Sequence, residues 1–289
     1  MSTRASDEAP RGLRGHAALV YPALMMAVFF VIPFAIMIAV SFFRRIEGAF
    51  YEPGFVLDNY RRFLTPLFID HMLVSLYFAA LAAAVSVAVG FPFTYFVTRM
   101  GRRAQVAILV FLLSVLSLSE VIVGFSWSVL LSRTAGVSNL LVWVGLMDRP
   151  VAWTPGFVAV VFGLCYLVFP YTVLVLFPPV SRLDRELTEA ARTLGASPLR
   201  TFFTIVVPVL RPAIVAALIL AFVFTLGAYL IPQVLGRPQH WTLSVLITDQ
   251  AIYHANAPFS AAMAIFLMLV SLGLVGLTLG LGRRRERPA

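Results

Sequence analysis

The 289-residue sequence contains no lysine, and all 22 of its basic residues are arginine. A phosphate-binding loop of the Walker A type needs a lysine to reach the β- and γ-phosphates of a nucleotide, so this chain lacks a normal one. We therefore expect any ATP-driven work that involves this protein to be powered by a different subunit.

Charged residues of either sign are also scarce. They make up 12% of the chain, whereas an ordinary soluble domain has about 25%. Hydrophobic residues make up 61%. This composition excludes a soluble globular enzyme as well as disordered and fibrous chains, and it leaves a membrane protein that crosses the bilayer several times.

Cysteine and histidine are rare. The single cysteine, Cys165, lies in an apolar stretch, so no disulfide can form within the chain and we expect a buried, apolar role. The four histidines have no ligand spacing such as H-x-x-x-H (His16, His71, His240 and His254). The sequence therefore predicts no metal site, no bound cofactor and no catalytic residue.

The net charge of +9 raises the alternative of nucleic-acid binding, because arginine is well suited to phosphate recognition. The arginines, however, are spread over several loops and form no single basic helix. Membrane proteins accumulate arginine in cytoplasmic loops. We therefore expect the lipid bilayer, and not nucleic acid, to be the partner of this chain.

Six apolar stretches are long enough to cross a hydrocarbon core, which takes about 20 helical residues. None alternates in polarity like a barrel strand, so we predict an all-α membrane protein, a bundle of six transmembrane helices in a single domain, 1–289. The first stretch is too long for a cleaved signal peptide. The expected spans are residues 17–43, 72–98, 104–132, 155–178, 212–235 and 258–282.

The distribution of arginine predicts the orientation, because short basic loops stay in the cytoplasm. With the N-terminus inside, 15 of the 22 arginines lie in inner segments and seven in outer loops. Both termini are therefore expected in the cytoplasm. Arg44 and Arg45 form a local exception, because they follow the outer end of the first span directly.

The inner loop over residues 182–211 has a helical pattern. Its first half places four apolar residues on one helical face (Leu187, Ala190, Ala191 and Leu194). Arg185, Glu189 and Arg192 are spaced for ion pairs beside that face. Gly195 then provides a helix stop, and Ser197 with the following proline begins a second helix. We predict two short helices that meet at an angle at Gly195.

Two interpretations of this loop are open from the residues alone. A bent amphipathic element can anchor a protein at the membrane surface. Such an anchor usually presents many basic residues and bulky aromatic residues, whereas residues 186–191 are small and acidic (ELTEAA). This composition favours insertion into a groove of another protein.

The same loop resembles the EAA loop of ABC importer permeases. The pattern begins with Glu189-Ala190-Ala191, and Gly195 follows after three residues. It ends with Ile205 and Val207-Pro208, where Val207 replaces the usual leucine. Three other segments are similar to the spermidine/putrescine group of these permeases: residues 57–60 (LDNY), 136–139 (GVSN) and 229–236 (YLIPQVLG).

The resemblance implies a type I ABC importer permease in the bacterial inner membrane. It implies a second, homologous permease subunit, with a heterodimer favoured over a homodimer, and a periplasmic substrate-binding protein. Two cytoplasmic ATP-binding subunits would hold ATP and Mg²⁺ and bind the loop. The implied coupling residues are Glu186, Glu189, Ala190, Ala191, Gly195, Ser197 and Pro208.

Within this resemblance the implied solute is spermidine or putrescine. Similar systems import other small nitrogenous solutes, namely amino acids, opines, γ-aminobutyrate and aminoethylphosphonate, and these stay open as alternatives. A secondary transporter would need its own ion-coupling groups, usually several intramembrane carboxylates or inverted repeats. A membrane enzyme would need paired catalytic groups within the spans. The sequence has neither pattern.

Glu120 is the only acidic residue well inside an expected span, which makes it a functional candidate. Trp127 follows it at helical spacing, and a carboxylate beside aromatic rings suits a cationic solute. A structural hydrogen bond between helices is the alternative for Glu120. Tyr166 and Tyr229 are further candidates for the solute pathway, although Tyr229 is also typical of an anchor at the membrane interface.

Overall fold

The computed structural model describes residues 20–46, 51–134 and 136–284. Within these ranges the regular structure is helical, apart from one isolated antiparallel bridge between Arg44 and Glu52. The prediction of an all-α membrane protein is therefore confirmed.

Four helices in the described ranges are individually long and apolar enough to cross a membrane. The first is Val20–Ser41, which includes η1 (Ala27–Val31) and α2 (Ile32–Ser41). The other three are α4 (Pro66–Arg99), α8 (Phe157–Ser181) and the segment Ala257–Gly276 of α15 (Ala257–Arg284). Two bent helix pairs qualify only when each pair is taken together: α5 (Arg102–Leu116) with α6 (Glu120–Leu130), and Pro198–Val209 with α12 (Arg211–Gly227). Six spans result when each pair counts as one.

The other helical segments in these ranges are short. They are α3 (Asp58–Arg61), η2 (Arg62–Leu64), α7 (Val137–Trp143), α9 (Arg185–Thr193), α10 (Pro198–Thr201), η3 (Phe202–Val206), α11 (Val207–Val209), α13 (Leu230–Leu235), η4 (Pro238–His240), α14 (Leu243–Thr248) and η5 (Asp249–Tyr253).

The structure divides the expected third span, 104–132, at residues 117–119, where α5 and α6 form an angle of 95°. Before the break, the hydroxyls of Ser114 and Ser117 donate to carbonyls four residues earlier. Such bonds bend helices, because the side-chain oxygens share acceptors with the backbone ladder. With 15 residues, α5 is only about 22 Å long, so the break lies short of a full crossing.

The expected fifth span, 212–235, is also divided. α12 ends at Gly227, residue 228 is extended, and α13 begins after Tyr229. A helix end inside a membrane leaves carbonyl groups without partners, and these need hydrogen-bond donors from elsewhere in the protein.

Residues at the start of α14 supply those bonds. The hydroxyl of Ser244 donates to the carbonyl of Leu226 at 2.8 Å, and the hydroxyl of Thr242 donates to the carbonyl of Ala228 at 3.3 Å. The N–H of Leu243 donates in turn to the hydroxyl of Ser75 on α4 at 2.6 Å. These buried bonds hold α14 against the broken end of α12.

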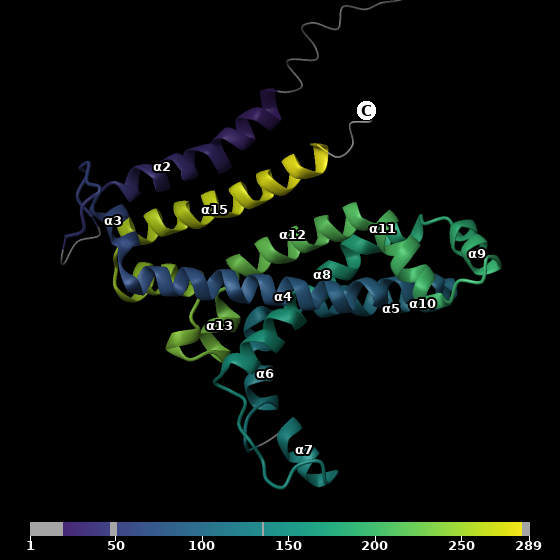
Figure 1. Ribbon diagram of the computed structural model, residues 1–289. Coiled ribbons are helices and arrows are strands. Elements are labelled where there is room, and N and C mark those ends of the chain that lie inside the picture. The colour runs from purple at the N-terminus through teal and green to yellow at the C-terminus, as the bar shows by residue number, and fades with distance from the viewer. Residues whose placement is uncertain (1–19, 47–50, 135, 285–289) are drawn as a thin grey trace, which may run out of the picture.

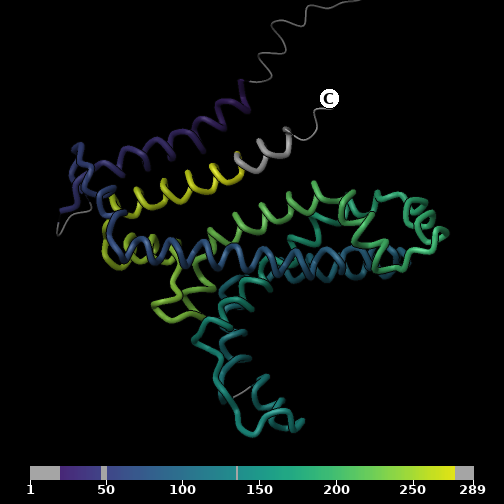
Figure 2. The backbone as a smooth tube through the Cα atoms, viewed as in Figure 1, coloured from purple at the N-terminus to yellow at the C-terminus, as the bar shows by residue number. Residues whose placement is uncertain are grey.

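The centre of the molecule is formed by α4, α8 and α12, which lie side by side (Figure 1). Their contacts include the buried side chains of Val87, Val168, Leu176, Ala217 and Ala221. Helix α2 packs along α15 at one side of this centre (Figures 1 and 2). Pro170 lies inside α8 without ending it.

Helix α13 packs closely between α6 and α8 because both helices have a glycine at the contact. A Cβ atom at Gly163 of α8 would lie 2.7 Å from side-chain carbons of both Ile231 and Leu235. A Cβ atom at Gly124 of α6 would lie 3.4 Å from Leu230. The second half of the divided fifth span is therefore held against the second half of the divided third span.

Two parts of the chain project from this centre (Figures 1 and 2). The segment from α9 to α11 lies at the end of the molecule opposite to α3, and α6 and α7 extend away from the bundle. The indole of Trp143 in α7 is 86% exposed.

Candidate functional site

The predicted pair of helices that meet at Gly195 is confirmed. Asp184 caps α9, because its carboxylate accepts the N–H of Glu186 at 2.9 Å. Gly195 has φ +84°, a left-handed conformation that glycine adopts without steric cost. The hydroxyl of Ser197 then accepts the N–H of Arg200 at 3.3 Å and caps α10, which begins with Pro198.

The apolar face expected on α9 is only partly buried. Thr188 and Ala191, three residues apart, face the rest of the chain, and each is 8% exposed. Leu187, Ala190 and Leu194 point outward instead, and Leu194 is 89% exposed. Within this chain α9 contacts the short segments α10 and η3, so most of its predicted apolar face stays exposed, which agrees with insertion into a groove of another protein.

The acidic residues of α9 are exposed as well. Glu186 and Glu189 lie on the outward side. Among the described residues the ion pairs are Asp58 with Arg61 and Asp249 with His254, so the expected pairs of Glu189 with neighbouring arginines are not formed. Exposed pairs of this kind gain little free energy, because ordering two long side chains costs entropy. The outward surface of α9 therefore carries acidic, basic and apolar side chains, and its glutamates form no ion pair among the described residues.

Glu120 is the first residue of α6, directly after the break in the third span. It is half-buried, and its carboxylate faces the backbone of Ile231 in α13. Its Oε1 atom is buried without a hydrogen-bond partner in the described part of the chain. The structure thus places an acidic group where the two divided spans meet.

Trp127 and Tyr166 lie together. Their ring centroids are 5.6 Å apart in an edge-to-face arrangement, and Phe162 lies 6.3 Å from Trp127. Tyr229 precedes α13 and is 38% exposed. Within the described ranges it shares no ring contact, hydrogen bond between side chains or ion pair with Glu120, Trp127 or Tyr166. The structure therefore groups two of the four pathway candidates directly.

Trp127 and Tyr166 also line an open cavity of about 370 Å³ between α4, α5, α6 and α8. Three phenylalanines complete an aromatic wall: Phe111, Phe162 and Phe169. Ser86 and Cys165 also line the cavity. Sequence reasoning missed Ser86 and the phenylalanines, because α4 and α8 are apolar on all sides and periodicity does not distinguish their faces. The one available signal was a lone serine in a run of alanine and valine.

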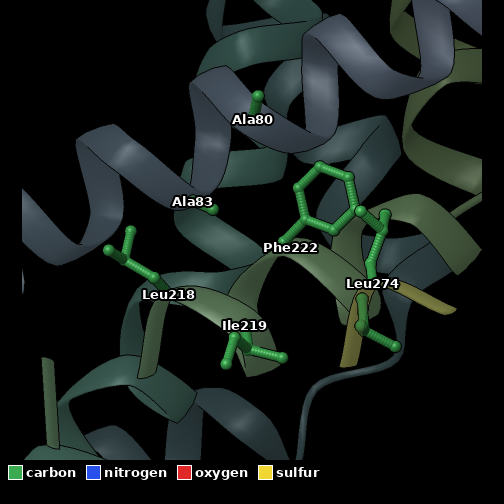
Figure 3. A pocket seen from close by; sticks show the side chains of 7 residues that line it. Ala80, Ala83, Leu218, Ile219, Phe222 and Leu274 are labelled. Atoms are coloured by element: carbon green, nitrogen blue, oxygen red, sulfur yellow. The ribbon is translucent and has the colours of Figure 1, made fainter. Parts of the chain in front are cut away.

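A second cavity, of about 280 Å³, lies between α4, α12 and α15 (Figure 3). Figure 3 shows Phe222 and Leu218 of α12 beside Ala80 and Ala83 of α4, with Leu274 of α15 at the edge. Every lining side chain is apolar, so the cavity offers no group that would orient a polar solute. It does not extend the candidate site.

The two arginines that follow the first span, Arg44 and Arg45, have structural partners. The backbone of Arg44 forms both hydrogen bonds of the bridge to Glu52. The guanidinium of Arg45 donates to the carbonyl of His254 at 2.8 Å. This bond joins the loop after the first span to the segment before α15. It gives a structural reason for arginines at a position where the predicted orientation disfavours positive charge.

No three His, Cys, Asp or Glu side chains lie close enough to hold a metal ion in the described ranges.

Comparison with known proteins agrees with this architecture. The sequence profile of the family described as "Binding-protein-dependent transport system inner membrane component" matches residues 23–287. The chain is 31% identical over 252 residues to the spermidine/putrescine transport system permease protein PotB of Escherichia coli K12. The aligned region covers 86% of this chain and 90% of that protein. The PotB protein of Haemophilus influenzae is 26% identical over 249 residues and is covered to 87%.

A solved structure has the same fold. A chain of a bacterial ABC transporter for import of the acidic polysaccharide alginate superimposes with a TM-score of 0.76, at 20% identity, over 96% of this chain and 97% of that one. The resemblance inferred from the EAA loop is thereby confirmed. Because the family profile covers nearly the whole sequence, this protein belongs to the binding-protein-dependent permeases of the bacterial inner membrane, the membrane-spanning subunits of ABC importers.

Proposed function

We propose that this permease forms half of the membrane pathway for spermidine or putrescine. The observation that supports this solute is the identity with the E. coli spermidine/putrescine permease over most of both chains. The half-buried acid Glu120, inside a divided span, agrees with a cationic solute, because a carboxylate in a membrane is costly without a positive partner.

Energy is supplied by two cytoplasmic ATP-binding subunits that hold ATP and Mg²⁺. They bind the outward surface of α9, where Glu189 pairs with a basic residue of the ATPase and Ala190 allows close approach. The exposed position of both residues and the left-handed Gly195 support this role. The coupling set is completed by Glu186, Ala191, Ser197 and Pro208, and both termini lie on the same cytoplasmic side.

The pathway is completed by other proteins. A second permease of different sequence forms the other half, and a periplasmic binding protein delivers the solute. Glu120 and Trp127 contact the solute on this side of the pathway, with Tyr166 and Tyr229 nearby along it.

The solute is tested on the cognate binding protein. We expect spermidine or putrescine to raise its Tm more than γ-aminobutyrate, an opine or aminoethylphosphonate, because a ligand at about 100 times its Kd stabilises the folded state by about 2.7 kcal/mol. A shift produced only by one of the other solutes would contradict the proposal. ATP-dependent uptake of the same solutes by the assembled transporter provides the second measurement.

The role of Glu120 is tested by Glu120→Gln. Uptake of putrescine should fall more than uptake of N-acetylputrescine, which has one charge fewer, because the amide cannot pair with an ammonium group. Glu52→Gln, on the loop that bridges to Arg44, is the matched control and should leave both rates unchanged. An equal loss for the two solutes would remove charge recognition from the role of Glu120.

A further inference from the structure

The cavity between α4, α5, α6 and α8 has the features of a small-molecule site. Its volume of about 370 Å³ falls in the range of ligand pockets, which are commonly about 300–1,000 Å³. It opens where α5 and α6 diverge, because Phe111 and Leu112 line it from α5 and Trp127 lines it from α6. A solute that moves past the break in the third span would meet this cavity.

Ser86 is the unusual group in its wall. The side chain is 1% exposed, and its hydroxyl, beside the thiol of Cys165, forms no hydrogen bond to a nitrogen or oxygen atom in the described part of the chain. Other buried hydroxyls in the same helices donate to the carbonyl four residues earlier, as Ser75, Thr94 and Thr172 do. The hydroxyl of Ser86 is therefore left to bond a molecule in the cavity, since a buried hydroxyl without a nitrogen or oxygen partner is unfavourable.

The remaining wall suits a cation with a hydrocarbon chain. Five of the twelve lining residues are aromatic, and aromatic faces attract ammonium groups while the apolar side chains accommodate methylene groups. No Asp, Glu, Arg or His lines the cavity. A site without a carboxylate binds an ammonium group weakly enough to release it, which is what a conducting pathway requires.

Glu120 lies within reach of a second ammonium group. It is seven residues before Trp127 in the same helix, so both lie on one face of α6, about 10 Å apart along the axis. Gly124, on the same face, lies against α13. A flexible chain with two separated ammonium groups can therefore contact the carboxylate and the aromatic wall together.

We propose that this cavity is a transit site for an aliphatic polyamine. One ammonium group lies on the rings of Trp127 and Tyr166 and donates to the hydroxyl of Ser86, the methylene chain packs on the phenylalanines, and a second ammonium group pairs with Glu120. The choice of polyamine rests on the proposed function. The site itself rests on the cavity, the aromatic wall and the buried hydroxyl of Ser86.

Cys165 provides the experiment, because it is the only cysteine of the chain and lines the cavity. The assembled transporter in proteoliposomes is treated with 2-aminoethyl methanethiosulfonate, a thiol reagent that is itself a primary ammonium, or with N-ethylmaleimide, which is neutral. Modification of the Cys165 peptide is followed by mass spectrometry with and without spermidine. Cys165→Ser gives the background.

We expect the ammonium reagent to modify Cys165 and spermidine to slow that reaction. In Trp127→Leu or Ser86→Ala the spermidine concentration for half-protection should rise about tenfold, which corresponds to about 1.4 kcal/mol. The matched controls are Trp143→Leu, on exposed α7, and Ser114→Ala, which removes a hydroxyl that bonds within α5. In both controls spermidine should protect Cys165 at the same concentration as in the unchanged protein. Ser86→Thr should restore protection.

Three results would overturn the transit site. Modification by N-ethylmaleimide alone, without protection, means that a lipid chain occupies the cavity. No modification by either reagent means that side chains of the second permease cover it. Modification by the ammonium reagent without protection by spermidine means that the cavity is open but binds no polyamine. In all three cases spermidine uptake would persist, whereas a transporter that does not take up spermidine would contradict the proposed function instead.

Discussion

At the residue scale, the site depends on positions where one atom decides whether two helices can approach. Gly163 is such a position. Its missing Cβ leaves room for the side chains of Ile231 and Leu235, both of which are fully buried. The contact brings α13 against α8 and so sets the place of the break in the fifth span.

We expect Gly163→Ala to lower the stability of the purified transporter by about 1–3 kcal/mol, because the added methyl group would overlap two buried side chains. The measurement is thermal unfolding in detergent. Gly273→Ala on α15 is the control, since a Cβ atom there would meet nothing within 4 Å. Equal Tm values for the two variants would show that α13 can shift at no cost.

His240 makes the stability of the folded protein depend on pH. Burial lowers the pKa of its imidazole, and the charge of Arg237 lowers that pKa further. In the folded protein the neutral ring accepts the N–H of Arg237 at 3.3 Å. As the pH falls below the ordinary pKa value of 6.5, the unfolded chain takes up a proton that the folded chain resists, so the free energy of unfolding decreases.

We therefore expect the Tm to fall on acidification from about pH 7.5 to about pH 5.5, and to fall less in His240→Gln, whose side chain accepts a hydrogen bond but does not titrate. A series of melting curves over this range provides the test. Identical slopes for the two proteins would exclude His240 as a source of the dependence.

Some site residues could be predicted individually and others could not. Glu120 and Gly195 stand out in the sequence because a charge in a span and a glycine after a helical repeat are each unusual. Ser86 does not stand out, because serine is common in membrane helices and usually bonds its own backbone. Only the packing of α4 against α8 shows that its hydroxyl has no nitrogen or oxygen partner and lines a cavity.

At the scale of elements, α9 and the turn after it form the surface on which partner subunits would act. We expect Gly195→Trp and Glu189→Lys to leave the protein in the membrane at normal amounts but to reduce ATP-dependent uptake at least about tenfold. The reason for Gly195 is its left-handed backbone, which costs other residues about 1–2 kcal/mol.

Gly195→Asn is the matched control, because asparagine tolerates this conformation better than other residues, and it should keep more activity than Gly195→Trp. Uptake and membrane content are measured on the same preparations. Full uptake by Gly195→Trp would show that the bend in this loop has no part in coupling.

The buried bonds between α14 and α12 give a second prediction at this scale. Ser244→Ala would leave the carbonyl of Leu226 without its hydroxyl donor at the end of α12, and we expect a loss of about 1–3 kcal/mol in stability. Ser271→Ala, whose hydroxyl bonds only within α15, is the control and should be close to neutral. Thermal unfolding measures both, and a neutral Ser244→Ala would mean that water replaces the bond.

The positions of most helices could be predicted, and Gly227 with Tyr229 indicates a break in the fifth span, whereas the angle between α5 and α6 in the third span could not be predicted. The expected spans 104–132 and 212–235 are apolar throughout, and hydropathy does not distinguish a continuous helix from a divided one. The break in the fifth span is stable because Thr242 and Ser244 satisfy its carbonyls from the far side of a loop. These hydrogen bonds join residues 14 and 18 positions apart, so no local pattern contains them.

At the scale of the whole molecule, we propose that the chain forms one half of a larger assembly. Helices α6 and α7 extend from the bundle, and α9 presents apolar and acidic side chains at its end (Figure 1). We expect affinity purification of this chain to recover one second permease of different sequence and two ATP-binding subunits, with native mass spectrometry giving the stoichiometry.

Glu189→Lys should retain the second permease and lose the ATP-binding subunits, which separates the two interfaces. Recovery of two copies of this chain with no other permease would contradict the heterodimer. Recovery of neither ATP-binding subunit with the unchanged protein would contradict the proposed source of energy.

The sequence by itself determined that this is a membrane permease, and it is the basis for the proposal that another subunit powers it. The missing lysine, the scarcity of charge and the Glu189-to-Gly195 pattern are properties of the chain that need no folding to be seen. The tertiary structure decided where the spans break, which residues meet at the breaks and that Ser86 and Trp127 share a cavity. These features depend on hydrogen bonds and contacts between residues far apart in the chain, in helices that are apolar on every side, where only packing tells one face from another.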